Sequence, residues 1–200
     1  MKVEGVFGKI QPIEKGTIKI ETYNFDSKKD FLYNVRCREA MYYMYDGDYV
    51  RLYVNNQLMM SDTNMERTSN YEFIRYANGD VLIAGLGIGL IIFNILKKDN
   101  IKTITIIENN QDLIDVIAPY FKDYPNVKII HGDIFEWVPD KGIKYDTIYF
   151  DIWPDICEDN LDEIKILHNK FKNKINRNNP NYYMNSWLKD YLKGLRRRNR

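Results

Sequence analysis

Glycines follow a short apolar run in the middle of the chain, where they could help bind a ligand. Residues 81–84 are apolar, and Gly85, Gly87 and Gly89 come directly after them. Glycines let the backbone turn sharply and approach a ligand closely, and a helix that starts after such a turn presents free N–H groups. The same pattern is also compatible with a tight strand-to-helix connection that binds nothing.

An acidic residue ends the next apolar run. Glu108 lies nineteen residues after Gly89, near the separation at which a carboxylate can accept hydrogen bonds from the two hydroxyls of a ribose. The dinucleotide fingerprint G-x-G-x-x-G is not met, because Leu90 stands where the third glycine would be. A nucleoside cofactor without a pyrophosphate therefore fits better, although Glu108 alone could be a solvated strand end.

Two later apolar runs also end in acidic residues. Asp133 could accept a hydrogen bond from an adenine amine while Ile134 lies against the ring; alternatively, Asp133 caps a following helix. Asp151 could attract a cationic group or hold a nucleophile near an electrophile, and Trp153 could stack on a flat substrate. The alternative for this segment is a capped turn with a core tryptophan.

Strands and helices that would position these residues alternate after residue 62. We expect strands at 81–84, 103–107, 127–130, 145–150 and 182–185, and helices at 65–76, 89–96, from 110, at 161–175 and from 186. Pro119 should kink or stop the helix that starts at 110. This alternation predicts an α/β fold with an open, mostly parallel sheet and helices on both faces, which binds ligands at the carboxyl ends of its strands.

The first 62 residues show a different pattern, rich in Tyr, Val and Ile and interrupted by turns. We expect a small antiparallel β unit with strands at 17–23, 41–45, 49–54 and 57–61. Asp46-Gly47 between two such runs predicts a hairpin, and Asn55-Asn56 predicts the next turn. We therefore expect two domains, residues 1–62 and residues 63–200.

Composition narrows the class of protein. The net charge of +1 gives no global electrostatic argument for binding nucleic acid or a membrane. Cys37 and Cys157 cannot form a disulfide framework, and His131 and His168 have no metal-ligand spacing. The start of the chain lacks the apolar core of a signal peptide, and the apolar segment 81–93 is too short to span a membrane. We expect a cytoplasmic protein without a metal.

Residues 40–155 resemble the class I S-adenosylmethionine-dependent methyltransferase superfamily, and within it the spermidine synthase-like branch. The motifs are VLIAGLGIG at 81–89, IIE at 106–108, HGD at 131–133 and YDTIYFD at 145–151. Residues 49–73 are similar to the branch's N-terminal hairpin and linking helix. The resemblance implies a Rossmann-like domain that binds S-adenosylmethionine.

The resemblance also implies roles for single residues. Gly85, Gly87 and Gly89 would face the amino acid tail of the cofactor, Glu108 would bind the ribose, and Asp133 would read the adenine, with Ile134 beside it. Asp151 matches the first aspartate of the D-S-S-D-P-like motif that aminopropyltransferases of the branch carry, and would be catalytic.

Three differences from the motifs of aminopropyltransferases bear on the identity of the substrate. Pro154 occupies the place of the motif's second aspartate, so that Asp155, the other catalytic candidate, comes one residue late. Ile88 stands where aminopropyltransferases have an aspartate, and Met59 replaces their hairpin glutamine. Because a polyamine needs several carboxylates, we expect a methyltransferase of unknown acceptor. The alternatives are an aminopropyltransferase and a non-catalytic adenosyl-binding or assembly protein.

The C-terminal part departs as well. The sheet of the superfamily has seven strands, and we expect the last two to be absent after Asp151, which would leave a sheet edge to be covered. Together with the tyrosines of residues 1–62, this predicts a homo-oligomer. Basic residues cluster at the end of the chain: Lys189, Lys193, Arg196, Arg197, Arg198 and Arg200. They could hold nucleic acid phosphates, but a solvated helix end is the interpretation we prefer.

Overall fold

The computed structural model describes residues 2–198 and divides the chain into two compact units. Unit 1 comprises Met1–Arg75 and Gly87–Lys97, and unit 2 comprises Tyr76–Leu86 and Lys98–Arg200. The chain thus leaves unit 2 after Leu86, inside the glycine-rich turn, and re-enters it at Lys98. The domain boundary that we expected after residue 62 stays a prediction.

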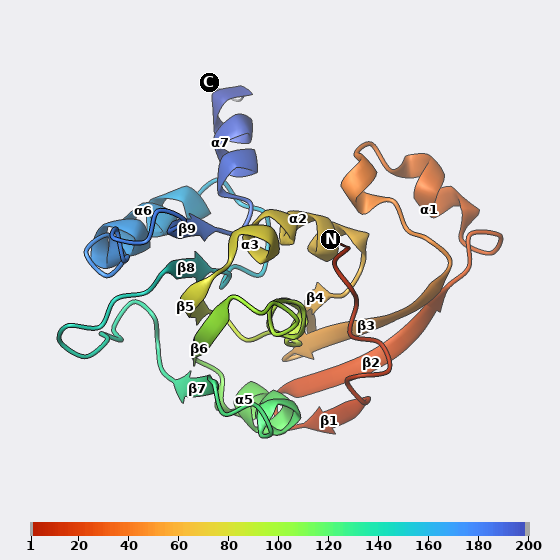
Figure 1. The fold of residues 1–200 in the computed structure, drawn as a ribbon. Helices are drawn as coiled ribbons and strands as arrows, with labels where there is room; N and C mark the ends of the chain where they lie inside the picture. Colours follow the sequence, from red (N-terminus) through yellow and green to blue (C-terminus); the bar gives the residue numbers. More distant parts are fainter. Residues whose placement is uncertain (1, 199–200) are drawn as a thin grey trace. The chain divides into compact units, whose positions relative to one another are not determined.

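Unit 2 contains a parallel sheet of five strands, in the order β7-β6-β5-β8-β9 (Figure 1). The strands are β5 Gly79–Ala84, β6 Ile101–Glu108, β7 Val127–His131, β8 Thr147–Phe150 and β9 Tyr183–Ser186. Every residue of β8 is buried, as expected for a central strand covered on both faces. The expected α/β fold with a parallel sheet is confirmed, and each strand lies within a few residues of its predicted place.

The helices of unit 2 follow from local sequence signals. The side chain of Asn110 caps α5, Gln111–Ile117, by accepting a hydrogen bond from the Leu113 N–H at 3.2 Å. Pro119 ends that helix, and the chain continues as the short 3-10 helix η2, Ala118–Phe121. The other two helices are α6, Asn160–Phe171, and α7, Lys189–Arg198.

Aromatic contacts fix α6 against the sheet of unit 2. The ring of Phe171 lies 5.4 Å from that of Phe150 on β8, centroid to centroid, and 6.4 Å from that of Trp137. His168, one helical turn earlier, lies 5.7 Å from Phe150 and shares a hydrogen bond of 2.9 Å with the Ser186 hydroxyl on β9. These contacts position the end of β8, where Asp151 follows.

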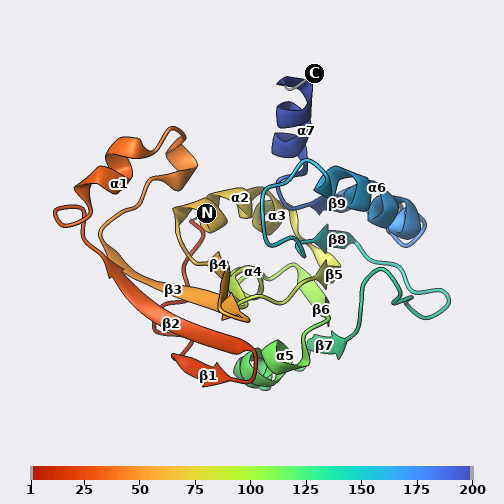
Figure 2. The ribbon, with the colours of Figure 1, turned by 180° about the vertical axis from the view of Figure 1, so that it is seen from behind.

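Unit 1 contains an antiparallel sheet of four strands in the order β1-β2-β3-β4 (Figure 2). The strands are β1 Ile13–Lys15, β2 Ile18–Phe25, β3 Gly47–Val54 and β4 Gln57–Ser61. Asn55 and Asn56 have φ values of 51° and 64°, as a two-residue hairpin turn of type I′ requires. The expected antiparallel unit and its second turn are confirmed.

The hairpin expected at Asp46-Gly47 is wrong. Between β2 and β3 the chain forms helix α1, Phe31–Arg36, and the 3-10 helix η1, Ala40–Tyr42, so the strand expected at 41–45 does not form. The Asn34 side chain donates to the Met44 carbonyl at 2.8 Å and accepts from the Met44 N–H at 2.9 Å. It satisfies the backbone groups that a neighbouring strand would otherwise have paired.

The single helix expected at 65–76 is divided in two. Helix α2, Asn64–Ser69, ends at the fully buried Asn70, whose side chain donates to the Glu66 carbonyl at 3.2 Å, and α3, Tyr71–Tyr76, follows. The remaining helix of unit 1 is α4, Leu90–Ile95, which starts after Gly89 in the left-handed region at φ 70°.

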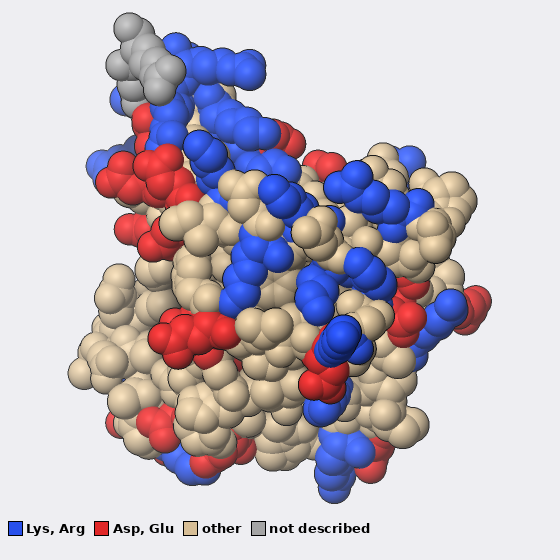
Figure 3. Space-filling view, turned by 90° about the vertical axis from the view of Figure 1, so that its left-hand side faces the viewer, with Lys and Arg blue, Asp and Glu red and all other residues tan. Residues whose placement is uncertain are grey.

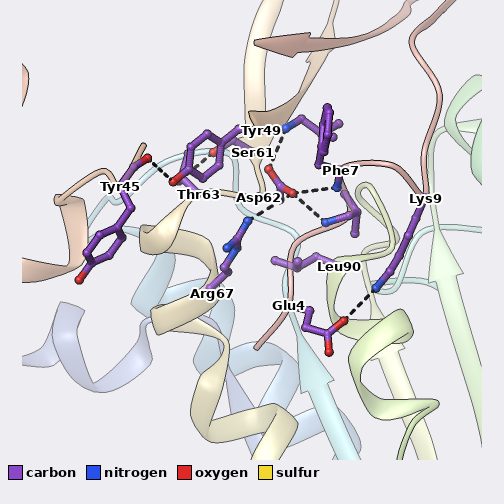
Figure 4. Close-up of polar contacts among 12 residues, drawn as sticks. Glu4, Phe7, Lys9, Tyr45, Tyr49, Ser61, Asp62, Thr63, Arg67 and Leu90 are labelled. Carbon is purple, nitrogen blue, oxygen red and sulfur yellow. Dashed lines mark hydrogen bonds and ion pairs between the residues drawn. The ribbon is translucent and has the colours of Figure 1, made fainter. Parts of the chain in front are cut away.

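A buried carboxylate holds unit 1 together (Figure 4). Asp62 has no exposed surface, and its Oδ2 accepts hydrogen bonds from the Val6 N–H at 2.7 Å and the Phe7 N–H at 3.2 Å. Its Oδ1 accepts from the Val50 N–H of β3 at 2.7 Å, and Arg67 of α2 lies 3.6 Å from Oδ2. One side chain thus connects the N-terminal segment, β3 and α2.

Within residues 2–198, no helix has the length and apolar character needed to cross a bilayer.

Candidate functional site

The carboxyl ends of four parallel strands meet in unit 2. The Gly85 N–H after β5 donates to the Ile107 carbonyl of β6 at 2.9 Å, and the Asp151 N–H after β8 donates to the Ala84 carbonyl of β5 at 2.8 Å. The Gly132 N–H after β7 donates to the Glu108 carbonyl at 2.9 Å. The fold therefore gathers the strand-end residues that the sequence singled out, as expected for an open α/β sheet.

Gly85 occupies a position that excludes every other residue type. Its φ of +96° lies in the region that L-residues rarely adopt. A Cβ atom there would lie 2.0 Å from the Asp151 carbonyl oxygen, far inside van der Waals contact. The glycine was expected to let the backbone approach a ligand; the structure shows that it also lets β5 approach the end of β8.

Gly87 and Gly89 belong to unit 1. Both have positive φ values, 50° and 70°, and a Cβ atom on Gly87 would lie 2.3 Å from the Met60 sulfur. The Ile88 N–H lies 3.3 Å from the same sulfur, and the Ile88 side chain is fully buried. Met60 of β4 is thus the hairpin residue that contacts the glycine-rich turn. The sequence had instead singled out its neighbour Met59.

Glu108 is 7% exposed at the end of β6, and its two oxygens are each bound by backbone N–H groups. Oε2 accepts from Leu86 at 2.9 Å and Oε1 from Asn110 at 2.8 Å. Burial raises the pKa of this carboxyl, and the backbone hydrogen bonds partly oppose that rise. Because each carboxylate oxygen has two acceptor positions, Glu108 can still receive hydroxyl donors while it fixes the turn.

Asp133 is exposed after β7. Its Oδ1 accepts from the Phe135 N–H at 2.8 Å, which closes a turn. The next element after this turn in the described chain is the strand β8 and not a helix, so the alternative prediction of a helix cap is wrong. Ile134 beside it is 4% exposed, and its carbonyl accepts from the Lys170 ammonium at 3.1 Å.

Asp151 is the acid with the strongest change in protonation at this edge of the sheet. Burial raises the pKa of its carboxyl from 3.8 to about 7, which brings it near neutral pH. Four residues later Asp155 is exposed, and its carbonyl accepts from the Asn160 side chain at 2.9 Å. The raised pKa makes Asp151 suited to exchange a proton near neutral pH, and the catalytic role expected for Asp155 stays a prediction.

Trp153 is 8% exposed, and its indole N–H donates to the Glu163 carboxylate of α6 at 2.7 Å. This hydrogen bond holds the indole ring of Trp153 in place within unit 2. The stacking role expected from the sequence stays a prediction.

The side chains at the end of the sheet suit a ligand rich in donors and positive charge. Glu108, Asp133 and Asp151 follow three strands of one sheet and supply carboxylate oxygens. Ribose hydroxyls and an adenine amine are donors, and a sulfonium is a cation, so these residues fit an adenosyl sulfonium cofactor. Among the described residues, no group of three or more His, Cys, Asp and Glu side chains is arranged to hold a metal ion.

The sequence did not identify the backbone groups that hold Glu108, because the Leu86 N–H acquires its direction only from the turn at Gly85. It also did not identify Met60. The structure identifies it through the register of the β3–β4 pair, in which Leu52 opposes Met60.

Comparisons with known proteins agree with this fold. The family model described as the spermine/spermidine synthase domain matches residues 59–176, more than half of the chain. No curated protein sequence matched.

Among solved structures, spermidine synthase from Thermotoga maritima is similar with 18% identity and a TM-score of 0.45, over 63% of this chain and 45% of its own. N-methyltransferase NodS from Bradyrhizobium japonicum WM9 is similar with 14% identity and a TM-score of 0.45, over 56% of this chain and 62% of its own. This chain thus spans less than two thirds of either structure.

The extent of the family match, over a sheet that ends in the expected glycine turn and acidic residues, leads to one conclusion: the chain belongs to the spermine/spermidine synthase domain family, within the superfamily of S-adenosylmethionine-dependent transferases.

Proposed function

We propose that the chain is an S-adenosylmethionine-dependent methyltransferase whose acceptor is positioned and deprotonated by Asp151. Glu108 binds the ribose of the cofactor and Asp133 its adenine amine, with Ile134 beside the ring. When bound, the cofactor supplies a methyl group already activated by the neighbouring sulfonium. The protein then contributes mainly alignment of the acceptor with that group, a contribution that can be large in transfer reactions.

The single observation that carries this proposal is the position of Asp151 at the carboxyl end of β8, where its N–H donates to the Ala84 carbonyl of β5 at 2.8 Å. A general base works best when its pKa lies near the working pH. With a pKa of about 7, the Asp151 carboxylate can take a proton from an acceptor amine or hydroxyl at its own oxygen, while a substantial fraction stays ionised. An ordinary exposed aspartate would be a much weaker base.

A second candidate function, transfer of an aminopropyl group, is favoured by the family model that matches residues 59–176. It requires decarboxylated S-adenosylmethionine, which ends in an ammonium group. In this chain the aspartate expected in the glycine turn is replaced by Ile88, which is fully buried and apolar. Ile88 supplies no carboxylate to pair with that ammonium, so we place methyl transfer first.

Paired transfer assays distinguish the two. The protein is incubated either with S-adenosylmethionine labelled on the methyl group or with decarboxylated S-adenosylmethionine labelled on the aminopropyl chain. A panel of amines, hydroxyl compounds and macromolecules is added to each, and label transfer is measured. We expect methyl transfer only, reduced about 100-fold or more by Asp151→Asn and less than threefold by Asp155→Asn. Aminopropyl transfer to putrescine from the decarboxylated cofactor would contradict the proposal.

A protein that binds the cofactor but transfers neither group to any acceptor would favour the third alternative, an adenosyl-binding or assembly protein. Asp151→Asn is the informative variant in that case as well. This variant keeps the size of the side chain but cannot ionise. If the protein only binds the cofactor, the variant should bind it with unchanged affinity, and neither protein should show transfer activity.

A further inference from the structure

A cavity of about 520 Å³ lies between α6 and α7 in unit 2 and is lined mainly by basic side chains. We call it the α6–α7 groove. The cationic residues that line it are Lys165, Lys189, Lys193, Arg196 and Arg197, and Asp162 is the one acidic residue among its lining side chains. None of these residues belongs to the candidate cofactor site. Figure 3 shows Lys and Arg side chains gathering in the upper part of the face that carries these helices.

The helical repeat places the cations of α7 along one side. Lys189, Lys193, Arg196 and Arg197 follow the spacing i, i+4, i+7 and i+8, which brings side chains to the same helix face. At a rise of 1.5 Å per residue they cover about 12 Å of the helix axis. Lys165 adds a further cation from α6.

The protein neutralises only part of this charge. Arg196 lies 3.3 Å from Asp162, and it donates to the Glu158 carbonyl at 2.6 Å. Lys193 lies 3.0 Å from Asp190, a pair in which both side chains are about half or more exposed and which is therefore weak. Lys165 and Arg197 are exposed and make no ion pair within residues 2–198. The groove thus keeps an excess of positive charge.

The positive charge of the groove affects the pKa of His168, which is one of its lining residues. Burial, together with the positive charges of Lys189 and Lys193, lowers the pKa of His168 from 6.5 to about 4. Its imidazole is neutral at physiological pH and shares its Nε2 hydrogen bond with Ser186. The groove is therefore lined by a neutral imidazole at His168 and by the cationic side chains named above.

The apolar side of α7 is already occupied. Leu192 is fully buried, and Leu195 is partly buried. A helix that binds a bilayer needs its apolar face free to enter the lipid, which is not the case here. The exposed side of α7 offers charge rather than apolar surface, so it suits a linear polyanion better than a membrane.

We propose that the α6–α7 groove binds the phosphate backbone of a single-stranded nucleic acid without reading its sequence. About 12 Å of helix corresponds to three or four phosphates at roughly 3.4 Å each along a strand. Arg197 can donate to phosphate oxygens through a pair of N–H groups, and the lysines act as point charges. Because these contacts are to phosphates, RNA and DNA of one sequence bind alike, and binding weakens steeply with salt.

The test is fluorescence anisotropy with labelled 20-nucleotide single-stranded RNA and DNA of mixed sequence, at 50 and 200 mM KCl. For three or four phosphates the logarithm of the affinity should fall with the logarithm of salt with a slope of about −2 to −3, a loss of roughly 20- to 50-fold over this range. Lys165→Gln/Arg197→Gln should weaken binding at 50 mM by about tenfold or more and make the slope shallower by roughly 1 to 1.5.

The matched control is Lys122→Gln/Lys128→Gln, which changes the net charge equally at exposed positions of unit 2 outside the groove. It should change affinity less than twofold. Equal weakening by the two double variants would contradict the proposal, as would the absence of binding by the wild-type protein at 50 mM KCl. Binding to phosphatidylserine vesicles without binding to either oligonucleotide would also contradict it and would assign the groove to a membrane.

Discussion

At the residue scale, the carboxyl end of the parallel sheet contains residues whose conformations are tightly constrained. Gly85 has no room for a side chain, and Glu108 is held by two backbone N–H groups. Asp151, beside them, is the group whose charge state is most affected by burial. Rigid placement of the first two fixes the geometry of the strand ends, and the raised pKa of the third supports the role that we propose for it.

Gly85→Ala should destabilise the protein severely. The added Cβ would meet the Asp151 carbonyl at 2.0 Å, and the φ of +96° is unfavourable for alanine. We expect a loss of about 2–4 kcal/mol in the free energy of unfolding, or failure to fold. Gly132→Ala is the control, because its nearest atoms would lie 3.9 Å away and its φ is not positive, so it should cost less than about 1 kcal/mol. Similar urea midpoints for the two variants would show that the turn is not constrained as described.

Asp151 also makes stability depend on pH. In the folded protein its carboxyl keeps a proton up to a pKa of about 7, whereas the unfolded value is 3.8. The folded state therefore binds more protons between these values, and this contribution to stability is complete below about pH 4 and is lost as the pH rises to 7. Asp151→Asn does not titrate. The free energy of unfolding of the wild type minus that of the variant should fall by up to about 1.4 kcal/mol per pH unit across this window. A difference that is constant from pH 4 to 7 would refute the raised pKa.

At the element scale, the parallel sheet could be predicted closely and the connections only in part. Continuous β-branched runs such as that of β6 identify buried strands without further information, and Pro119 marks the end of α5. Residues 26–46 were not predictable in this way. Their helices depend on the contact between Asn34 and Met44, which are ten residues apart, rather than on local preference.

The candidate site, like the fold, could be predicted from the sequence only in part. The positions of Glu108, Asp133 and Asp151 at strand ends follow from the rhythm of strands and helices. The hydrogen bonds of Glu108 and the pKa of Asp151 depend on the turn that starts at Gly85 and on surrounding burial, which a sequence does not specify.

The elements of unit 1 should depend strongly on Asp62. Asp62→Asn replaces one carboxylate oxygen by an NH₂ group that must face backbone N–H donors, and it removes the charge opposite Arg67. We expect a loss of about 2–4 kcal/mol in the free energy of unfolding. Asp48→Asn, at an exposed position that accepts from the Asn24 side chain, should change it by less than about 0.5 kcal/mol. Equal chemical denaturation curves for the two variants would contradict the role assigned to Asp62.

At the scale of the whole molecule, unit 1 leaves apolar side chains exposed. Helix α1 buries none of its residues, and Phe31 and Val35 are 59% and 74% exposed. Tyr43 and Tyr45 are exposed nearby in the sequence, whereas Tyr49 belongs to the core. Exposed apolar groups of this kind are typical of interfaces, and they support our proposal of a homo-oligomer to which residues 1–62 contribute.

Light scattering after size-exclusion chromatography tests the assembly. We expect at least a dimer of the 23.9 kDa chain at micromolar concentration. Phe31→Glu/Val35→Glu should give a monomer with an unchanged circular dichroism spectrum, because both side chains are exposed in the single chain. A wild-type monomer would reject the proposal, and so would a variant that keeps the assembly intact.

The central claim is that unit 2 binds an adenosyl cofactor through the acidic end of its sheet. Isothermal titration calorimetry of the purified protein with S-adenosylmethionine and with S-adenosylhomocysteine measures this directly. The account predicts one site per chain for both ligands, and a loss of about 1.5–3 kcal/mol in binding free energy, roughly 10- to 150-fold in affinity, for Glu108→Ala. Asp140→Ala, at an exposed position remote in sequence from the strand ends, should bind as the wild type does. Absence of binding by the folded wild type, or equal affinity of the wild type and Glu108→Ala, would contradict the account.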